Sequence, residues 1–153
     1  MEMCDLPFTC NTNDPEQTLG VAARFAQLSQ PGDLILLSGP LGAGKTHFVR
    51  GFCRGLGMAD LWEVDSPTYT IVNHYDVASG VDHLDLYRFQ DAADLEEIDF
   101  EDMLASDSIL LVEWPERLDG YPIPMPRFVV SFEVGDESSR TIRITAPQEE
   151  AVS

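Results

Sequence analysis

Residues 39–46 read GPLGAGKT and fit the pattern G-x-x-x-x-G-K-[ST], which is typical of a phosphate-binding loop. Glycine lets the backbone adopt conformations that other residues avoid, so the loop can aim its N–H groups at a phosphate, together with the start of the next helix. We expect Lys45 to reach the β- and γ-phosphates of a nucleotide and the Thr46 hydroxyl to bind Mg²⁺. The predicted cofactor-binding residues are Leu41, Gly42, Ala43, Gly44, Lys45 and Thr46.

The alternative for this segment is a glycine-rich turn without a ligand. Its neighbours favour the nucleotide loop instead. Residues 33–38 contain a short apolar run, which is typical of a strand buried on both faces. Residues 45–56 carry apolar side chains at helical spacing, and Gly55 and Gly57 are expected to end this helix. The loop therefore stands between a buried strand and a helix, as a nucleotide loop requires.

A nucleotide loop also needs an acidic residue nearby to hold the metal ion, and Glu113 is a candidate. It follows the apolar run ILLV at 109–112, which predicts a second doubly buried strand within residues 108–114. The carboxyl ends of parallel strands meet at one edge of a sheet, so Glu113 is expected near the loop. A solvent-facing carboxylate at a strand end is the alternative.

A second candidate carboxylate, Asp85, lies in the segment HLDLYR at 83–88. Because side chains alternate along a strand, the two leucines of this segment are expected to face away, which leaves His83, Asp85 and Tyr87 on one side. A carboxylate there can orient a water molecule, accept a proton or contact Mg²⁺ through water. A hydrogen-bonded structural aspartate is an equally open interpretation.

The segment SPTYT at 66–70 combines four hydroxyl side chains with a proline. Hydroxyls in a loop at this position could sense the γ-phosphate, as the switch loops of GTPases do. A plain turn rich in serine and threonine explains the same residues equally well.

The remaining segments predict an α/β protein that forms a single domain over residues 1–147, with 148–153 as a frayed tail. Asp14 is expected to cap the first helix, because Pro15 suits the first helical position and Gln17 completes a capping pattern. The other predicted elements are a helix that starts at Asp14 and is broken by Pro31-Gly32, strands at 69–77 and 81–86, an acidic helical region at 92–105, and a C-terminal hairpin with strands at 128–134 and 142–144.

The charge balance excludes several classes of function. The 153 residues include 9 basic and 27 acidic side chains, which gives a formal charge of −18, and Lys45 is the only lysine. Nucleic acids and anionic membranes attract clustered Lys and Arg, so we expect this chain to be neither an independent DNA- or RNA-binding module nor a protein held on an anionic membrane. Three cysteines without C-x-x-C spacing, and no signal peptide or run of 18 apolar residues, predict a cytoplasmic protein with reduced thiols.

The chain resembles the TsaE family, also called YjeE, in four segments that occur in this order: GPLGAGKT at 39–46, SPTYT at 66–70, HLDLYR at 83–88 and LVEWPER at 111–117. That family is the small P-loop ATPase required for bacterial tRNA threonylcarbamoyladenosine biosynthesis. The resemblance runs from the first helix to the proline-rich segment at 121–126. Pro40 departs from it, because many members carry Asp there, but the phosphate donors come mainly from residues 42–46.

The resemblance implies a three-layer α/β/α P-loop domain with a mixed sheet that binds ATP and Mg²⁺. Lys45 would contact phosphate, Thr46 and Glu113 would bind the metal ion, and Asp85 matches the aspartate that the family needs for ATP hydrolysis. The implied catalytic residues are therefore Asp85 and Lys45. Thr68 and Thr70 would belong to the family's switch-like loop.

The resemblance also implies two protein partners, TsaB and TsaD. TsaD transfers the threonylcarbamoyl group to tRNA, and ATP hydrolysis by the TsaE component is expected to reset that complex between turnovers. The isolated chain is expected to be a slow ATPase that meets tRNA only through this complex.

Three other functions use a similar loop. A small-molecule kinase is the main alternative, but it usually needs a mobile lid that carries arginine, and no such segment is visible. A GTPase would need an N-K-x-D motif, which is excluded because the only lysine lies in the loop. An assembly protein with an inactive loop would have no need for Asp85 and Glu113.

Overall fold

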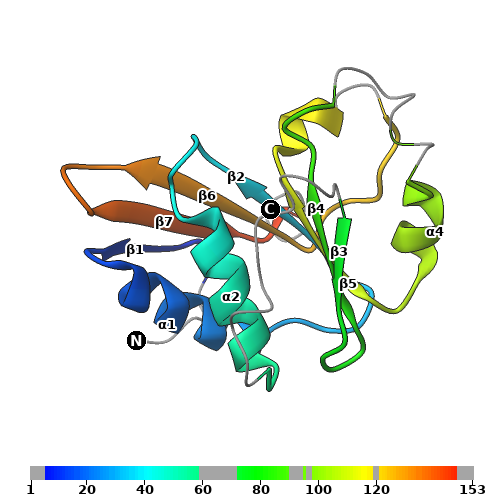
Figure 1. The fold of residues 1–153 in the computed structure, drawn as a ribbon, viewed down its shortest axis with the longest axis horizontal. Coiled ribbons are helices and arrows are strands. Elements are labelled where there is room, and N and C mark those ends of the chain that lie inside the picture. The colour runs from blue at the N-terminus through cyan, green and yellow to red at the C-terminus, as the bar shows by residue number, and fades with distance from the viewer. Residues whose placement is uncertain (1–5, 59–71, 90–94, 96–97, 119–120, 148–153) are drawn as a thin grey trace.

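The computed structural model describes residues 6–58, 72–89, 95, 98–118 and 121–147 (Figure 1). They form a seven-stranded mixed sheet with the strand order β1-β7-β6-β2-β5-β4-β3. The strands are β1 (Phe8–Thr12), β2 (Leu34–Ser38), β3 (Val72–Tyr75), β4 (Val81–Asp85), β5 (Ile109–Glu113), β6 (Phe128–Val134) and β7 (Arg140–Thr145). The helices are α1 (Pro15–Ala26), α2 (Lys45–Gly55), α4 (Phe100–Ala105) and the 3₁₀ helix η2 (Pro115–Leu118).

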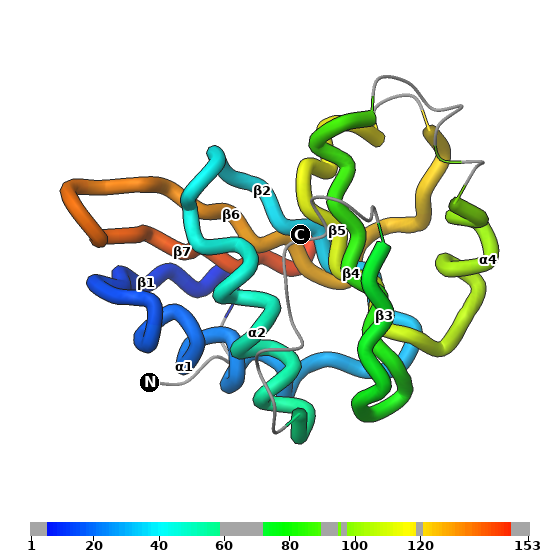
Figure 2. The backbone as a smooth tube through the Cα atoms, in the orientation of Figure 1, coloured from blue at the N-terminus to red at the C-terminus, as the bar shows by residue number. Residues whose placement is uncertain are grey.

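The centre of the sheet is parallel and its two edges are antiparallel. β2 pairs in parallel with both β5 and β6, and β4 pairs in parallel with β5. The hairpins β6–β7 and β3–β4 and the pairing of β1 with β7 are antiparallel. Because β2, β4 and β5 run in the same direction, their carboxyl ends lie at one edge of the sheet, where the chain continues from β2 towards α2 (Figure 2).

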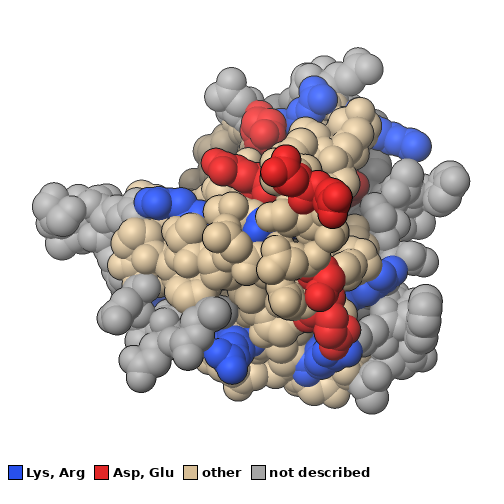
Figure 3. All heavy atoms as spheres, turned by 90° about the vertical axis from the view of Figure 1, so that its left-hand side faces the viewer, with Lys and Arg blue, Asp and Glu red and all other residues tan. Residues whose placement is uncertain are grey.

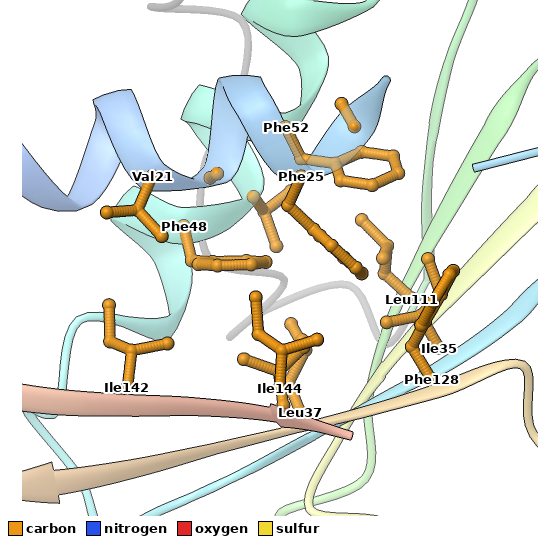
Figure 4. Packing of buried hydrophobic residues seen from close by; sticks show 14 of the residues in the cluster. Val21, Phe25, Ile35, Leu37, Phe48, Phe52, Leu111, Phe128, Ile142 and Ile144 are labelled. Carbon is orange, nitrogen blue, oxygen red and sulfur yellow. The ribbon is translucent and has the colours of Figure 1, made fainter. Parts of the chain in front are cut away.

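Two helices cover one face of this sheet, and their aromatic side chains form its main hydrophobic core. Phe25 of α1 lies between the two phenylalanines of α2 and Phe128 of β6 (Figure 4), with 4.9 Å between the ring centroids of Phe25 and Phe128. The alternating residues Ile35 and Leu37 of β2 supply the sheet side of this core. Burial of these apolar side chains holds α2 against the sheet, and with it the loop that precedes α2.

A second apolar cluster lies on the opposite face. Leu34 of β2, Leu84 of β4 and Leu110 of β5 face it, together with Phe100 of α4 and Leu118 of η2. The central strands are thus buried on both faces, which explains their continuous apolar runs. This arrangement confirms the predicted α/β fold with a mixed sheet and a C-terminal hairpin.

The two helices of the main core approach each other closely because α2 carries glycine at the contact. A Cβ atom added at Gly51 would overlap the backbone of Leu19, and one added at Gly55 would overlap the backbone of Ala23. The next glycine ends the helix: Gly57 has φ +110°, its N–H donates to Arg54 O, and the N–H of Met58 donates to Cys53 O.

We therefore predict that Gly51→Ala destabilises the protein although alanine favours helix formation. The added methyl group has no space beside the Leu19 backbone, and overpacking of this kind costs about 1–3 kcal/mol of unfolding free energy. The matched control is Gly20→Ala in α1, where nothing lies within 4 Å of an added Cβ and a gain of roughly 0.5–1 kcal/mol is expected. Urea denaturation of both variants checks the prediction, and a stabilised Gly51→Ala variant would contradict it.

Most predicted elements are present with small shifts at their ends. The Asp14 cap is confirmed, because Asp14 Oδ1 accepts the Gln17 N–H at 2.8 Å and Gln17 Oε1 accepts the Asn13 N–H at 2.6 Å. Strand β1 is an addition that the sequence analysis did not anticipate.

The segment at 66–70 and the tail at 148–153 lie outside the described residues, as do parts of the regions 69–77 and 92–105. Within the described part of the chain, no helix has the length and apolarity to cross a membrane.

Candidate functional site

A cleft of about 390 Å³ lies at the carboxyl ends of β2, β4 and β5. It contains the predicted loop residues 41–46 together with Asp85 and Glu113, whereas Thr68 and Thr70 lie outside the described residues. Its lining comes from the loop after β2, the ends of β4 and β5, the start of α1 and the β6–β7 hairpin. The lining residues are Asp14, Pro15, Thr18, Leu41, Gly42, Ala43, Gly44, Lys45, Thr46, His47, Asp85, Glu113, Trp114, Ser138 and Arg140.

The loop has the backbone that its glycines predict. Gly42 and Gly44 have φ values of +77° and +97°, in the left-handed region that residues with a Cβ rarely adopt. Gly39 is required for space, because an added Cβ would lie 2.8 Å from Phe132 Cβ. The carbonyl of Pro40 accepts the Ala43 N–H at 3.2 Å. An aspartate at this position would offer the same carbonyl, so this hydrogen bond does not need the N–H that proline lacks.

Lys45 is the first residue of α2, and its buried side chain lines the cleft. Its ammonium donates to the Gly39 carbonyl at 2.7 Å and lies 3.8 Å from the centroid of the Trp114 ring. Burial lowers the pKa of Lys45, while the carboxylates of Glu113, Asp85 and Glu116 act in the opposite direction. The site therefore presents a poorly hydrated cation, which a bound phosphate can neutralise.

Asp85 and Glu113 lie side by side because β4 and β5 pair with these residues in register. The backbone N–H of Tyr87 donates to Asp85 Oδ1 at 2.9 Å, which orients the carboxylate at the end of the strand. Burial is the main reason that the pKa of Asp85 is raised, and the charge of Glu113 adds to the effect. The Tyr87 N–H and the charges of His83 and Lys45 oppose this rise.

The predicted grouping of His83, Asp85 and Tyr87 separates into three environments. His83 is fully buried, and its Nε2 lies 2.5 Å from Glu113 Oε2. Asp85 lines the cleft. Tyr87 lies beyond the end of β4, where it is 43% exposed and its ring centroid is 4.9 Å from that of Trp114.

The structure adds residues that the sequence patterns did not reveal. Arg140 starts β7, and its guanidinium donates to the carbonyls of Glu137, Ser139 and Gly42, the last at 3.0 Å. The Ser138 hydroxyl donates to the Asn13 carbonyl at 2.6 Å, so the hairpin is joined to both the loop and the start of α1. No local signal marks these residues, because they reach the cleft only through the pairing of distant strands.

The oxygen donors in the cleft suit a magnesium ion that is bound together with phosphate. Thr46 supplies a hydroxyl and Glu113 a carboxylate, and Mg²⁺ is usually held by one or two such protein oxygens plus phosphate and water. In the part of the chain that the structure describes, no group of three or more His, Cys, Asp or Glu residues could hold a metal ion without such help.

Because burial raises the pKa of Asp85, its ionised carboxylate costs stability at neutral pH. We predict that Asp85→Asn raises the melting temperature at pH 7, since asparagine keeps the acceptor for the Tyr87 N–H without the charge. As the pH falls through the raised pKa towards 3.8, the native carboxyl is protonated and the difference should shrink. Thermal unfolding of both proteins between pH 4 and pH 8 tests this, and a variant less stable than the native protein at pH 7 would contradict it.

The chain is similar in sequence to one family of known proteins. The sequence model of the family described as "Threonylcarbamoyl adenosine biosynthesis protein TsaE" matches residues 12–142. The protein named tRNA threonylcarbamoyladenosine biosynthesis protein TsaE from Bacillus subtilis (strain 168) is 35% identical over 136 residues, covering 88% of this chain and 83% of the relative. The protein of the same name from Aquifex aeolicus (strain VF5) is 37% identical over 130 residues, covering 84% and 89%.

A solved structure extends the comparison to the fold. The crystal structure of Bacillus subtilus YdiB superimposes with a TM-score of 0.77 and 28% sequence identity, and the match covers 99% of this chain and 94% of that one. The family match includes the phosphate-binding loop, both carboxylates and the start of β7. This chain belongs to the TsaE family.

Proposed function

We propose that this chain binds ATP and Mg²⁺ and hydrolyses ATP as a component of tRNA threonylcarbamoyladenosine biosynthesis. The observation that carries the proposal is the single cleft in which Lys45 and Thr46 of the loop meet Asp85 and Glu113. The assignment to tRNA threonylcarbamoyladenosine biosynthesis rests on the names of the relatives. The small-molecule kinase loses its support, because the match to a different family spans most of the chain.

Each residue of the cleft has a distinct part in this proposal. Residues 41–46 surround the phosphates, and the Lys45 ammonium neutralises charge on the β- and γ-phosphates. Thr46 and Glu113 hold Mg²⁺, which stabilises the charge that develops on the phosphate oxygens. Asp85 orients the attacking water and accepts its proton, and a raised pKa makes its carboxylate a better base.

The geometry of the sheet also suggests where the two ends of the nucleotide lie. β5 and β4 lie on one side of β2 and bring Glu113 and Asp85, whereas β6 and β7 lie on the other side and bring Arg140. The γ-phosphate belongs with the two carboxylates and the metal ion. The nucleoside then lies towards the hairpin, beside Arg140, Ser138 and Pro15.

Hydrolysis by the isolated chain is expected to be slow. Among the residues described, Arg140 is the only arginine that lines the cleft, and its guanidinium already donates to three backbone carbonyls. An arginine supplied by a partner can be worth 10³–10⁵ in the rate of phosphoryl transfer. We propose that the partners TsaB and TsaD complete or order the site.

We propose that contact with tRNA is indirect and takes place in the cytoplasm, through the complex with TsaB and TsaD. Acidic side chains gather on the face shown in Figure 3. Exposed acids also flank the cleft, among them Asp14, Glu116 and Glu137. This charge repels the phosphates of tRNA and favours a basic surface on a protein partner.

Docking to the TsaB–TsaD complex should therefore weaken as salt rises, because a Debye length of about 8 Å at 0.15 M screens the attraction. Calorimetry at two salt concentrations measures this dependence, and filter binding at low salt measures the affinity of the isolated chain for tRNA. We expect partner binding that falls with salt, and no tight tRNA complex. Tight binding of tRNA by the isolated chain would overturn the proposal of indirect contact.

A further inference from the structure

The buried pair of His83 and Glu113 joins the interior of the sheet to the cleft. His83 lies opposite Leu111 in the pairing of β4 with β5, so it is a diagonal neighbour of Glu113 on the same face. His83 Nε2 and Glu113 Oε2 are 2.5 Å apart, and the two side chains are 0% and 5% exposed. Burial of a carboxylate is costly without a donor, so this contact decides where the Glu113 carboxylate can lie.

The hydrogen-bond pattern assigns the roles in this pair. A carboxylate oxygen accepts, so Nε2 of His83 is the donor and carries a hydrogen. The other ring nitrogen, Nδ1, is buried and has no hydrogen-bond partner among the described residues. The ring is enclosed by its neighbours in the sheet, with the Tyr75 ring centroid 6.5 Å away. Glu113 is therefore the one hydrogen-bond partner recorded for His83 in the described structure.

Only one member of the pair reaches the cleft. Glu113 lines it, together with Asp85 and Thr46, whereas His83 does not. His83 binds Oε2 and so leaves the other oxygen of Glu113, Oε1, for a ligand in the cleft. A residue behind the site that holds one oxygen of a metal-binding carboxylate fixes the direction of the other.

We propose that His83 is a positioning residue that holds the Glu113 carboxylate in the orientation in which it binds the divalent cation of the bound nucleotide. This inference rests on the metal-binding role proposed for Glu113. Removal of such a supporting hydrogen bond typically weakens metal binding 10- to 100-fold. Binding of the nucleotide without metal should change little, because His83 does not touch the cleft.

Three substitutions separate a positioning role from simple packing. His83→Leu fills the space and removes the donor. His83→Gln keeps an N–H donor at the same number of bonds from the backbone as Nε2, so it can reach Glu113. His83→Asn is the matched control, because its amide nitrogen corresponds to Nδ1 and does not reach Glu113.

The test is a titration of Mn²⁺ into protein–ADP complexes, followed by electron paramagnetic resonance, with ADP affinity in EDTA and thermal unfolding measured on the same samples. We expect His83→Leu and His83→Asn to lose about 10- to 100-fold in Mn²⁺ affinity. His83→Gln should stay within a few-fold of the native protein, and all variants should bind ADP in EDTA with similar affinity. If His83→Leu fails to fold, the comparison of the glutamine and asparagine variants decides the question.

Glu113→Gln distinguishes the two ways in which the experiment can fail. If it lowers Mn²⁺ affinity but His83→Leu and His83→Asn do not, the positioning role of His83 is wrong and the proposed metal site stands. If Glu113→Gln itself binds Mn²⁺ as tightly as the native protein, the proposed metal-binding role of Glu113 is wrong. Equal losses in His83→Gln and His83→Asn would also overturn the inference, because the position of the donor would then be irrelevant.

Discussion

Asp85→Ala is expected to lower kcat for ATP hydrolysis by about 100-fold or more, measured with TsaB and TsaD present. The Asp85 carboxylate lines the cleft beside Glu113, and burial raises its pKa, which suits the proposed role of accepting a proton from water. ATP affinity should change little, because the phosphate contacts are proposed for the loop and Lys45 and not for Asp85. Stopped-assay measurement of phosphate release, with calorimetry of ATP binding, separates the two quantities.

The control for this variant is Asp82→Asn on the same strand. Within the described residues Asp82 does not line the cleft, and its Oδ1 lies 2.6 Å from His74 Nδ1. This change can reduce stability but should leave kcat near the native value. If Asp85→Ala hydrolyses ATP at the native rate in the complete system, Asp85 is a structural residue and its catalytic role is wrong.

Lys45→Ala is expected to weaken ATP binding by roughly tenfold or more, because a hydrogen bond to a charged group contributes about 1.5–3 kcal/mol. The ammonium is nearly enclosed, between the Gly39 carbonyl and the Trp114 ring, so its charge is poorly screened by water. Isothermal calorimetry gives the affinity. The fluorescence of Trp114 should also respond to MgATP in the native protein, since its ring lies against the lysine.

Two further variants make this measurement specific. Lys45→Met keeps an unbranched side chain of similar length but removes the charge and the N–H donors, so it should lose nearly as much affinity as Lys45→Ala. Arg143→Ala changes the net charge equally, but this exposed side chain on β7 is not part of the cleft lining, and ATP affinity should be retained. Equal ATP affinity in the native protein and Lys45→Ala would refute the assignment of the phosphate site.

The local parts of the fold and site were predictable because their causes are local. The Asp14 cap depends on residues within four positions, and the loop depends on glycines that the structure shows with positive φ. The alternation of side chains along β4 predicted that Leu84 and Asp85 face opposite sides of the sheet. Leu84 lies in the second apolar cluster, and Asp85 lines the cleft. The apolar runs of β2 and β5 predicted central strands because a strand buried on both faces needs apolar residues throughout.

The parts that the sequence concealed depend on contacts between distant segments. β1 reads FTCNT, where the alternation is limited to Phe8 and Cys10, and this short segment is a strand through its pairing with β7. Arg140 reaches the loop carbonyl of Gly42 only because the sheet order places β7 close to β2. The contact of His83 with Glu113 joins residues 30 positions apart, and its existence depends on the register of two strands.

We propose that ATP hydrolysis by this chain serves tRNA threonylcarbamoyladenosine formation together with TsaB and TsaD. The most direct measurement follows phosphate release and the modified nucleoside in one reaction that contains this chain, TsaB, TsaD, tRNA and the threonylcarbamoyl donor. We expect slow hydrolysis by the chain alone, faster hydrolysis with the partners, and repeated rounds of modification that are lost with Lys45→Ala. Repeated modification at the native rate with Lys45→Ala, or full-speed hydrolysis without the partners, would contradict the account.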